Sequence, residues 1–384
     1  MIRFARDDVA YHDEPGARAR LIHTRQWSGG AMLAQKLKRL ELTDVFIYLL
    51  GLGILAVVIV GSGATLVQAK YSARAWFDLV LFGVTLGSIY ALIALGYTLV
   101  YGILRMINFA HSEVFMGGPY IAYFIADAMG KAGFIEQNPV LAIIIIFLVA
   151  MFSSTMIAML VERIAYRPLR HAPRLVPLIT AIGASFFLQY TFFRLFGPNL
   201  KVYPTFHMFD ASIAFGDFKI TYLQIFVIVA AGVLMLALHQ FVQRTKVGKA
   251  MRAVSEDRET AALMGINVDN IIVTTFALGG ALAGAAGVLY VLVFNQVTAF
   301  LGFVPGIKAF TSAVLGGIGN IPGAMLGGLF LGVIESLGPT LFLDGLGIAA
   351  PYQLKDAIAF TMLVLVLIFR PAGILGERLT EKKA

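Results

Sequence analysis

The amino-acid sequence predicts an all-α polytopic integral membrane protein, a bundle of about ten membrane-embedded helices. Hydrophobic residues make up 59% of the 384 residues, and the mean hydropathy is +0.83. Charged residues account for 14%, against about 25% in soluble domains. Several apolar stretches exceed the roughly 18 residues that a membrane-crossing helix needs. A membrane β-barrel would instead show alternating apolar and polar residues over segments of about ten, which this sequence does not.

Ten apolar stretches are predicted to form the membrane-embedded helices. The eighth and ninth are short, rich in Gly and separated only by Ile321 and Pro322. This leaves open whether one of them is re-entrant rather than spanning. The predicted helices lie at about 45–67, 78–103, 108–128, 139–162, 175–196, 220–242, 271–294, 303–320, 323–343 and 352–370.

The distribution of Lys and Arg predicts the side of the membrane on which each loop lies. With the N-terminus inside, most basic residues fall in the N-terminal tail, the 163–174 and 244–270 loops and the C-terminal end. Because positive charge favours the cytoplasmic side, both termini are predicted to be cytoplasmic. The net charge of +8 then belongs to inner loops that lack the interleaved aromatic residues of a nucleic-acid surface. The outer loops hold Lys70, Arg74, Lys131, Lys201 and Lys219.

Enzymatic chemistry finds no support in the sequence. Cysteine is absent, so neither disulfides nor thiol chemistry are available. A phosphate-binding loop needs Gly-Lys followed by Ser or Thr, whereas Lys131 and Lys249 are each followed by Ala. His111 and Glu113 do not share a helix face and make a poor metal pair. We therefore expect no ATPase activity, no catalytic residue and no metal or other cofactor in this chain.

The charged segment 244–270 interrupts the apolar sequence and is the main functional candidate. Its middle is rich in helix-forming residues and ends at Gly265, a residue type that commonly terminates helices. A short helix with an alanine face would fit a groove in a cytoplasmic protein, although a solvated connector is equally consistent with these residues. The residues that we expect to transmit force are Glu259, Ala261, Ala262 and Gly265, with Arg252 and Arg258 as charges at the rim of the groove.

Two opposite charges lie at similar depth within the predicted spans. By the helical rise, Lys308 is about 8 Å and Glu335 about 12 Å from the outer end of its helix. Because a charge near the membrane centre costs roughly 2.5–3.5 kcal/mol, we expect the two side chains to pair. The pair could gate the outer pathway and meet a zwitterionic substrate, or it could serve only to hold the helices together.

The third predicted helix begins with polar residues. Asn108 is a plausible N-cap, and Glu113 suits the first turn of a helix. Both residues could serve capping and packing, or they could line the pathway.

Two further patterns concern packing and the outer surface. Glycines recur at the spacing that lets membrane helices approach closely, so we expect most of them to be packing residues. The longest outer segment, 197–219, carries regularly spaced aromatic residues and is expected to form a short hairpin or a surface helix. It could be a landing surface for an external partner or simply an ordered connector.

Several stretches together resemble the permeases of ABC importers for branched-chain amino acids, of the LivH type. The loop at Glu259 is similar to the family motif of Glu-Ala-Ala followed three residues later by Gly, with Thr260 in place of the first Ala. The resemblance covers about residues 78–376, whereas residues 1–77, with their additional span, have no recognised counterpart. The stretches that carry it are 83–102, 106–113, 161–168, 262–267, 308–324 and 371–376.

The resemblance implies a permease subunit of the inner (cytoplasmic) membrane that moves branched-chain or other hydrophobic amino acids. The implied partners are a second permease subunit, either LivM-like or a second copy of this chain, two cytoplasmic ATPase subunits that use ATP, and an extracytoplasmic substrate-binding protein. Urea or short amides are alternative substrates, and an ion-coupled secondary transporter is an alternative mechanism. The resulting domains are a cytoplasmic basic tail (1–43), an extra transmembrane helix with its linker (44–77), the permease domain (78–376) with its cytoplasmic coupling loop (244–270), and a cytoplasmic tail (377–384).

Overall fold

The computed structural model describes residues 42–376 apart from residues 171, 174 and 371. The predicted N-terminal tail up to residue 41 and the predicted C-terminal tail 377–384 lie outside the described residues. The chain forms two compact units, residues 1–56 and 57–384. The described part of the first unit is the beginning of helix α2 (Leu42–Gln68), and the second unit holds the rest of the architecture.

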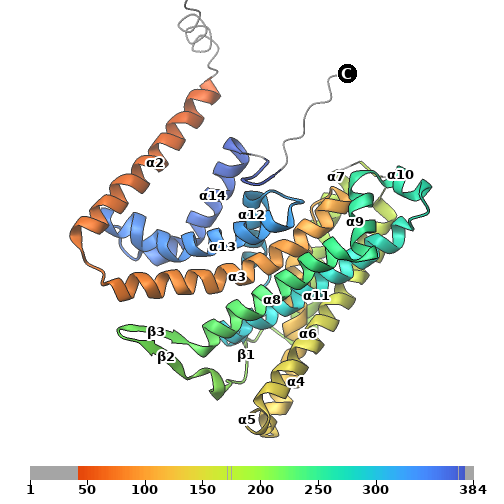
Figure 1. Ribbon diagram of the computed structural model, residues 1–384, viewed down its shortest axis with the longest axis horizontal. Coiled ribbons are helices and arrows are strands. Elements are labelled where there is room, and N and C mark those ends of the chain that lie inside the picture. Colours follow the sequence, from red (N-terminus) through yellow and green to blue (C-terminus); the bar gives the residue numbers. More distant parts are fainter. Residues whose placement is uncertain (1–41, 171, 174, 371, 377–384) are drawn as a thin grey trace, which may run out of the picture. The chain divides into compact units, whose positions relative to one another are not determined.

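Ten helices occupy the ten predicted apolar stretches, which confirms the predicted fold class (Figure 1). Eight helices within the described residues are long and apolar enough to cross a membrane, and α4 and α12 are the other two. Helix α12 has 14 residues and is therefore about 21 Å long, shorter than the roughly 30 Å hydrocarbon layer. The helices after α2 are α3 (Ala73–Leu104), α4 (His111–Lys131), α6 (Pro139–Val161), α7 (Leu175–Phe196), α8 (Tyr222–Arg244), α11 (Val268–Phe294), α12 (Phe303–Gly316), α13 (Ile321–Gly338) and α14 (Lys355–Phe369).

Short elements connect these helices. Strands β2 (Ser212–Phe215) and β3 (Phe218–Thr221) pair in antiparallel fashion, with Ser212 opposite Thr221, so the outer segment forms the hairpin that was one of its two predicted structures. Strands β1 (Lys201–Val202) and β4 (Gln296–Val297) form a second antiparallel pair. The remaining elements are α5 (Phe134–Gln137), η1 (Glu162–Tyr166), η2 (Arg167–Leu169), η3 (His207–Phe209), α9 (Lys246–Glu256), α10 (Arg258–Leu263), η4 (Pro339–Leu343), η5 (Asp344–Leu346) and η6 (Pro351–Leu354).

Helix α3 is the centre of the bundle, and glycines let its neighbours pack directly on its backbone. A Cβ atom at Gly328 or Gly332 of α13 would overlap the backbone of Ala91 or Gly87 of α3. Gly284 of α11 packs in the same way against the Ala150 carbonyl of α6. The prediction that these glycines are packing residues is confirmed, and their close contacts hold α13 directly on α3 and α11 directly on α6.

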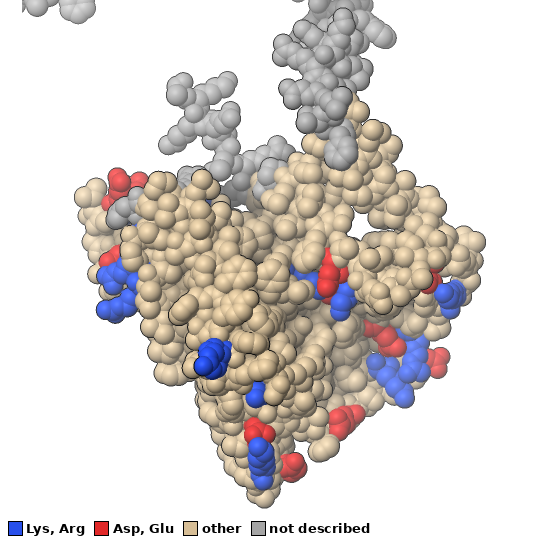
Figure 2. Space-filling view, turned by 180° about the vertical axis from the view of Figure 1, so that it is seen from behind, with Lys and Arg blue, Asp and Glu red and all other residues tan. Residues whose placement is uncertain are grey.

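The second unit has two opposite ends, which we name after the elements that lie there. Helix α8 is about 35 Å long and runs from β3 to α9, so the β2–β3 hairpin and α10 lie at opposite ends of it (Figure 1). Most of the face shown in Figure 2 is uncharged, and its charged side chains gather in small groups, as expected of a surface that faces lipid. We call the two ends the hairpin end and the α10 end.

The last turns of α2 pack on the segment that links α13 to α14. Gly61 lies directly against the Phe342 carbonyl, where no Cβ would fit. The Thr65 hydroxyl donates a hydrogen bond to the Leu341 carbonyl at 3.1 Å, and Lys70 forms an ion pair with Asp344 at 3.0 Å. The additional N-terminal helix is therefore anchored to the bundle by residues 61–70.

Candidate functional site

The charged loop at the α10 end folds into two short helices. The Thr245 hydroxyl accepts from the Gly248 amide at 3.0 Å and caps α9. Asp257 separates α9 from α10 and caps the latter, because its Oδ1 accepts from the amides of Glu259 at 2.9 Å and Thr260 at 3.1 Å. The Thr260 hydroxyl donates to the same carboxylate, and these hydrogen bonds lower the pKa of Asp257 below its ordinary value. The cap therefore stays charged at neutral pH.

Helix α10 ends at Leu263, and Gly265 terminates it two residues later, as predicted. Gly265 has a φ of +84°, a left-handed backbone that glycine adopts without strain, and its amide donates to the Ala262 carbonyl at 3.0 Å. Just before it, Leu263 is 88% and Met264 is 79% exposed. These two apolar side chains were not among the predicted residues, although an apolar pair next to a helix-terminating glycine in a polar loop could have indicated them.

One predicted coupling residue, Ala261, and the two predicted rim charges, Arg252 and Arg258, make contacts within the chain itself. Ala261 is 4% exposed and packs against the bundle, so its side chain is not available to a partner's groove. Arg252 donates to Gln243, at 3.0 Å to the side chain. Arg258 donates through two nitrogens to the Ile103 carbonyl at the end of α3. Glu259 and Ala262 are exposed, as a docking surface requires.

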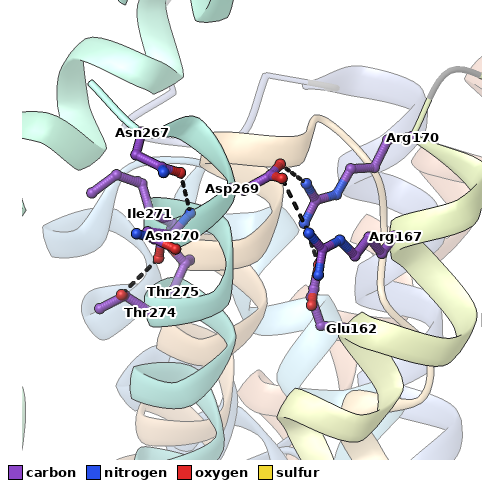
Figure 3. A network of polar contacts seen from close by, with 9 residues as sticks. All are labelled: Glu162, Arg167, Arg170, Asn267, Asp269, Asn270, Ile271, Thr274 and Thr275. Atoms are coloured by element: carbon purple, nitrogen blue, oxygen red, sulfur yellow. Dashed lines mark hydrogen bonds and ion pairs between the residues drawn. The ribbon is translucent and has the colours of Figure 1, made fainter. Parts of the chain in front are cut away.

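A network of charged side chains joins the neighbouring loop to the start of α11 (Figure 3). Arg170 forms ion pairs with both Glu162, whose side chain is 2% exposed, and Asp269. Arg167 also contacts Asp269, at 3.3 Å. The segment 161–168 was recognised as a family stretch without a role for its residues, and their proximity to Asp269 depends on the fold. The network ties η1 and η2 to the first turn of α11, directly after α10.

Lys308 and Glu335 form the predicted ion pair. The Lys308 Nζ lies 2.6 Å from Glu335 Oε1 and also 2.6 Å from Asp356 Oδ1 of α14. The Tyr90 hydroxyl of α3 donates to Glu335 at 3.4 Å. The ammonium group of α12 therefore connects α13 with α14, and both Lys308 and Glu335 are buried.

The polar start of α4 is buried and differs from the prediction in one respect. Asn108 does not cap α4 with its side chain; instead its Oδ1 accepts from the Tyr166 hydroxyl at 3.1 Å, because the chain before α4 packs against η1. Glu113 lies in the first turn, as predicted, and is fully buried. Its Oε1 accepts from Gln189 at 2.7 Å and from Ser185 at 3.1 Å, which joins α4 to α7.

These features define a multi-pass helical membrane protein with buried charges that are paired or hydrogen-bonded and a charged loop folded against one end of the bundle. The sequence profile of the family described as "Branched-chain amino acid transport system / permease component" matches residues 79–367. The chain therefore belongs to this family of membrane permeases. Helix α2 lies outside the matched segment.

Individual relatives agree with the family assignment. The high-affinity branched-chain amino acid transport system permease protein BraD of Pseudomonas aeruginosa is 45% identical over 305 residues, which are 78% of this chain and 95% of BraD. The corresponding protein LivH of Escherichia coli is 42% identical over 305 residues, with the same coverage. A probable LivH of Methanocaldococcus jannaschii is 28% identical over 294 residues, which are 74% of this chain and 88% of the relative.

Proposed function

We propose that this permease imports branched-chain amino acids across the cytoplasmic membrane, driven by ATP hydrolysis in separate subunits. The relatives named above are permeases of high-affinity systems for these amino acids, which supports the substrate class. The concentration of basic residues at the α10 end supports a cytoplasmic position for that end and for both termini. The partners in this proposal are a second permease subunit, two ATPase subunits and an external substrate-binding protein.

The structure of α10 is the observation that carries the proposal. Its exposed side presents Glu259, Ala262 and the apolar pair Leu263 and Met264, which would face the cytoplasm in this orientation. Its inner side is attached to the end of the central helix α3 through Arg258. A force applied by an ATPase to the exposed side would therefore reach the central helix α3 through one short element.

The buried polar groups take supporting positions in this proposal. Lys308 and Glu335 hold the short helix α12 between α13 and α14, and Glu113 holds the start of α4 against α7. Asn108 joins the segment before α4 to η1. Each of these contacts joins two elements that would slide past each other if the pathway switched from outward-facing to inward-facing. The residues would therefore set which arrangements of the helices are stable.

A pair of glycine variants tests the coupling role of α10. Gly265 and Gly216 both have a left-handed backbone, with φ of +84° and +60°. At both positions a Cβ atom would have open space around it, with no other atom within 4 Å. Gly265→Val and Gly216→Val therefore impose the same kind of strain at opposite ends of the protein. We expect Gly265→Val to abolish ATP-driven leucine uptake in proteoliposomes while the protein still inserts and purifies, and Gly216→Val to retain uptake. Full uptake by Gly265→Val would contradict the coupling role.

A further inference from the structure

A cavity of about 300 Å³ opens at the α10 end, between the last turn of α3 and the break between α9 and α10. Part of its lining belongs to the coupling loop, and the contact of Arg258 with Ile103 lies at its wall. Leu104, Met106 and Val254 supply apolar walls. Arg105, Arg258 and Glu256 supply charge. Its volume is at the lower end of the range for small-molecule sites.

The two guanidinium groups at this cavity are held by backbone carbonyls. Arg105 donates to the Ser255 carbonyl at 3.1 Å, and Arg258 donates to the Ile103 carbonyl at 2.5 Å from Nη2 and 3.1 Å from Nε. Within the described part of the chain, neither guanidinium lies within 4.0 Å of a carboxylate, and Glu256 lies within that distance of no basic group. The cavity therefore presents positive and negative groups that do not neutralise each other.

One further observation favours an anionic group beside these arginines. Burial lowers the pKa of Arg258, and the positive charges of Arg170 and Arg105 lower it further. Because Arg170 is already paired with Glu162 and Asp269, an added negative charge would chiefly relieve the repulsion between Arg258 and Arg105.

We propose that this cavity binds a branched-chain amino acid on the cytoplasmic side, a proposal that rests on the proposed function. The carboxylate of the amino acid would lie between Arg105 and Arg258, because guanidinium groups match carboxylates in geometry and charge. The ammonium group would pair with Glu256. The branched side chain would lie against Met106 and Val254. The three chemical features of the ligand thus correspond to three features of the cavity.

The position of the cavity gives the bound amino acid a consequence for transport. An occupant would touch residues 104–106 at the end of α3 and residues 254–258 across the break between α9 and α10. It would therefore hold α10 against α3 and stabilise one position of the coupling loop. A ligand that binds one arrangement better than another shifts the population toward it. The imported amino acid, once it accumulates inside, would slow its own import.

An inorganic anion or a lipid phosphate is the competing occupant, and the cavity disfavours it. Glu256 would repel a phosphate, whereas it would attract the ammonium group of an amino acid. The apolar walls would also leave a compact anion without contacts. Four probes therefore separate the features of the ligand: leucine has all three, N-acetylleucine lacks the ammonium charge, leucinamide lacks the carboxylate, and inorganic phosphate lacks both the ammonium group and the apolar side chain.

The experiment uses the complete transporter in nanodiscs without acidic lipid and without the external binding protein. Leucine binding is measured by calorimetric titration for the unchanged protein, for Glu256→Gln and for Glu136→Gln, an exposed carboxylate in α5 at the hairpin end. We expect Glu256→Gln to weaken leucine binding about tenfold and Glu136→Gln to leave it unchanged. N-acetylleucine and leucinamide should each bind at least tenfold more weakly than leucine. Equal binding of phosphate or N-acetylleucine, or equal affinity in both variants, would overturn the proposal.

A second measurement separates this inference from the proposed function. Inside-out proteoliposomes hold the binding protein in the lumen, so leucine added outside meets only the ATPase side. We expect this added leucine to inhibit the ATP-driven export of leucine from the lumen. For Glu256→Gln, whose transport rate is compared with its own rate without added leucine, the same degree of inhibition should need about ten times more leucine. Absence of any ATP-driven leucine movement would refute the proposed function. Normal movement without inhibition would refute only the cavity assignment.

Discussion

The ion pair between Lys308 of α12 and Glu335 of α13 gives the sharpest prediction, because the two residues have different numbers of charged partners. Lys308 contacts two carboxylates, each at 2.6 Å. Among the described residues, Glu335, whose side chain is 2% exposed, has two polar side-chain partners, Lys308 and, at 3.4 Å, the Tyr90 hydroxyl. Removing the ammonium group therefore leaves a buried carboxylate without a counter-ion. Removing the charge of Glu335 leaves the ammonium group with Asp356.

This asymmetry orders the cost of the substitutions. Lys308→Met should destabilise the protein by about 3–5 kcal/mol, as expected when one partner of a buried pair is removed. Glu335→Gln should cost about 1.5–3 kcal/mol, the value of a hydrogen bond to a charged group. Asp356→Asn should cost about 1 kcal/mol or less, because Asp356 is 42% exposed. The double variant Lys308→Met with Glu335→Leu should recover most of the loss, since apolar replacement of both partners is often neutral.

Thermal unfolding of the purified protein, followed by size-exclusion chromatography after heating, gives the order of stabilities. The reasoning is refuted if Glu335→Gln lowers the melting midpoint as much as Lys308→Met, or if the double variant is no more stable than Lys308→Met. Leucine uptake by the double variant then decides the role of the pair. A stable double variant that transports has lost only a structural contact, whereas a stable one without uptake has lost a group that the pathway needs.

Three further predictions concern the anchor of α2, the loop network and the cap of α10. Gly61→Leu should detach the end of α2 and lower the melting midpoint, because a side chain there would overlap the Phe342 carbonyl. Gly63→Leu should have neither effect, because a Cβ atom at that position would have no other atom within 4 Å. Arg170→Gln should destabilise the protein by about 3–5 kcal/mol, because it leaves the buried carboxylate of Glu162 without its partner. Arg167→Gln removes an exposed ion pair and should cost about 1 kcal/mol or less. Chemical unfolding measures both values. Asp257→Ala should speed hydrogen exchange of the first α10 amides and Asp257→Asn should not. Since the folded pKa of Asp257 is below its ordinary 3.8, the cap should persist above that pH and weaken only as the pH falls below it. Loss of protection of these amides at pH 6, after correction for the intrinsic exchange rate at each pH, would contradict this.

Features set by local composition could be predicted from the sequence. The ten helices follow from long apolar stretches, because each must satisfy its own backbone hydrogen bonds in the membrane. The pairing of Lys308 with Glu335 follows from the cost of an isolated buried charge. The end of α10 at Gly265 follows from the left-handed backbone that glycine adopts without strain.

Features set by the packing of distant segments could not be predicted in this way. Asn108 has the residue type of an N-cap, but the approach of η1 gives its side chain a different partner. Arg258 was expected to face a partner, yet the end of α3 lies within its reach. Asp356 lies 48 residues after Lys308 in the sequence, and only the fold brings it to 2.6 Å from the Lys308 ammonium group. The same residue types in the same order would be consistent both with the predicted partners and with the partners found in the structure.

The nature of its contacts indicates where this permease can move. Helices α3 and α13 meet backbone to backbone through glycines, as do α11 and α6, and such contacts cannot slide without opening voids. The inner side of α10 meets the end of α3 mainly through hydrogen bonds from Arg258 to one carbonyl, each worth about 1.5–3 kcal/mol. Water can replace the partners of these bonds when α10 shifts, so breaking them costs little compared with separating the glycine contacts. Conformational change should therefore begin between α10 and α3 while the glycine-packed helices move as one body.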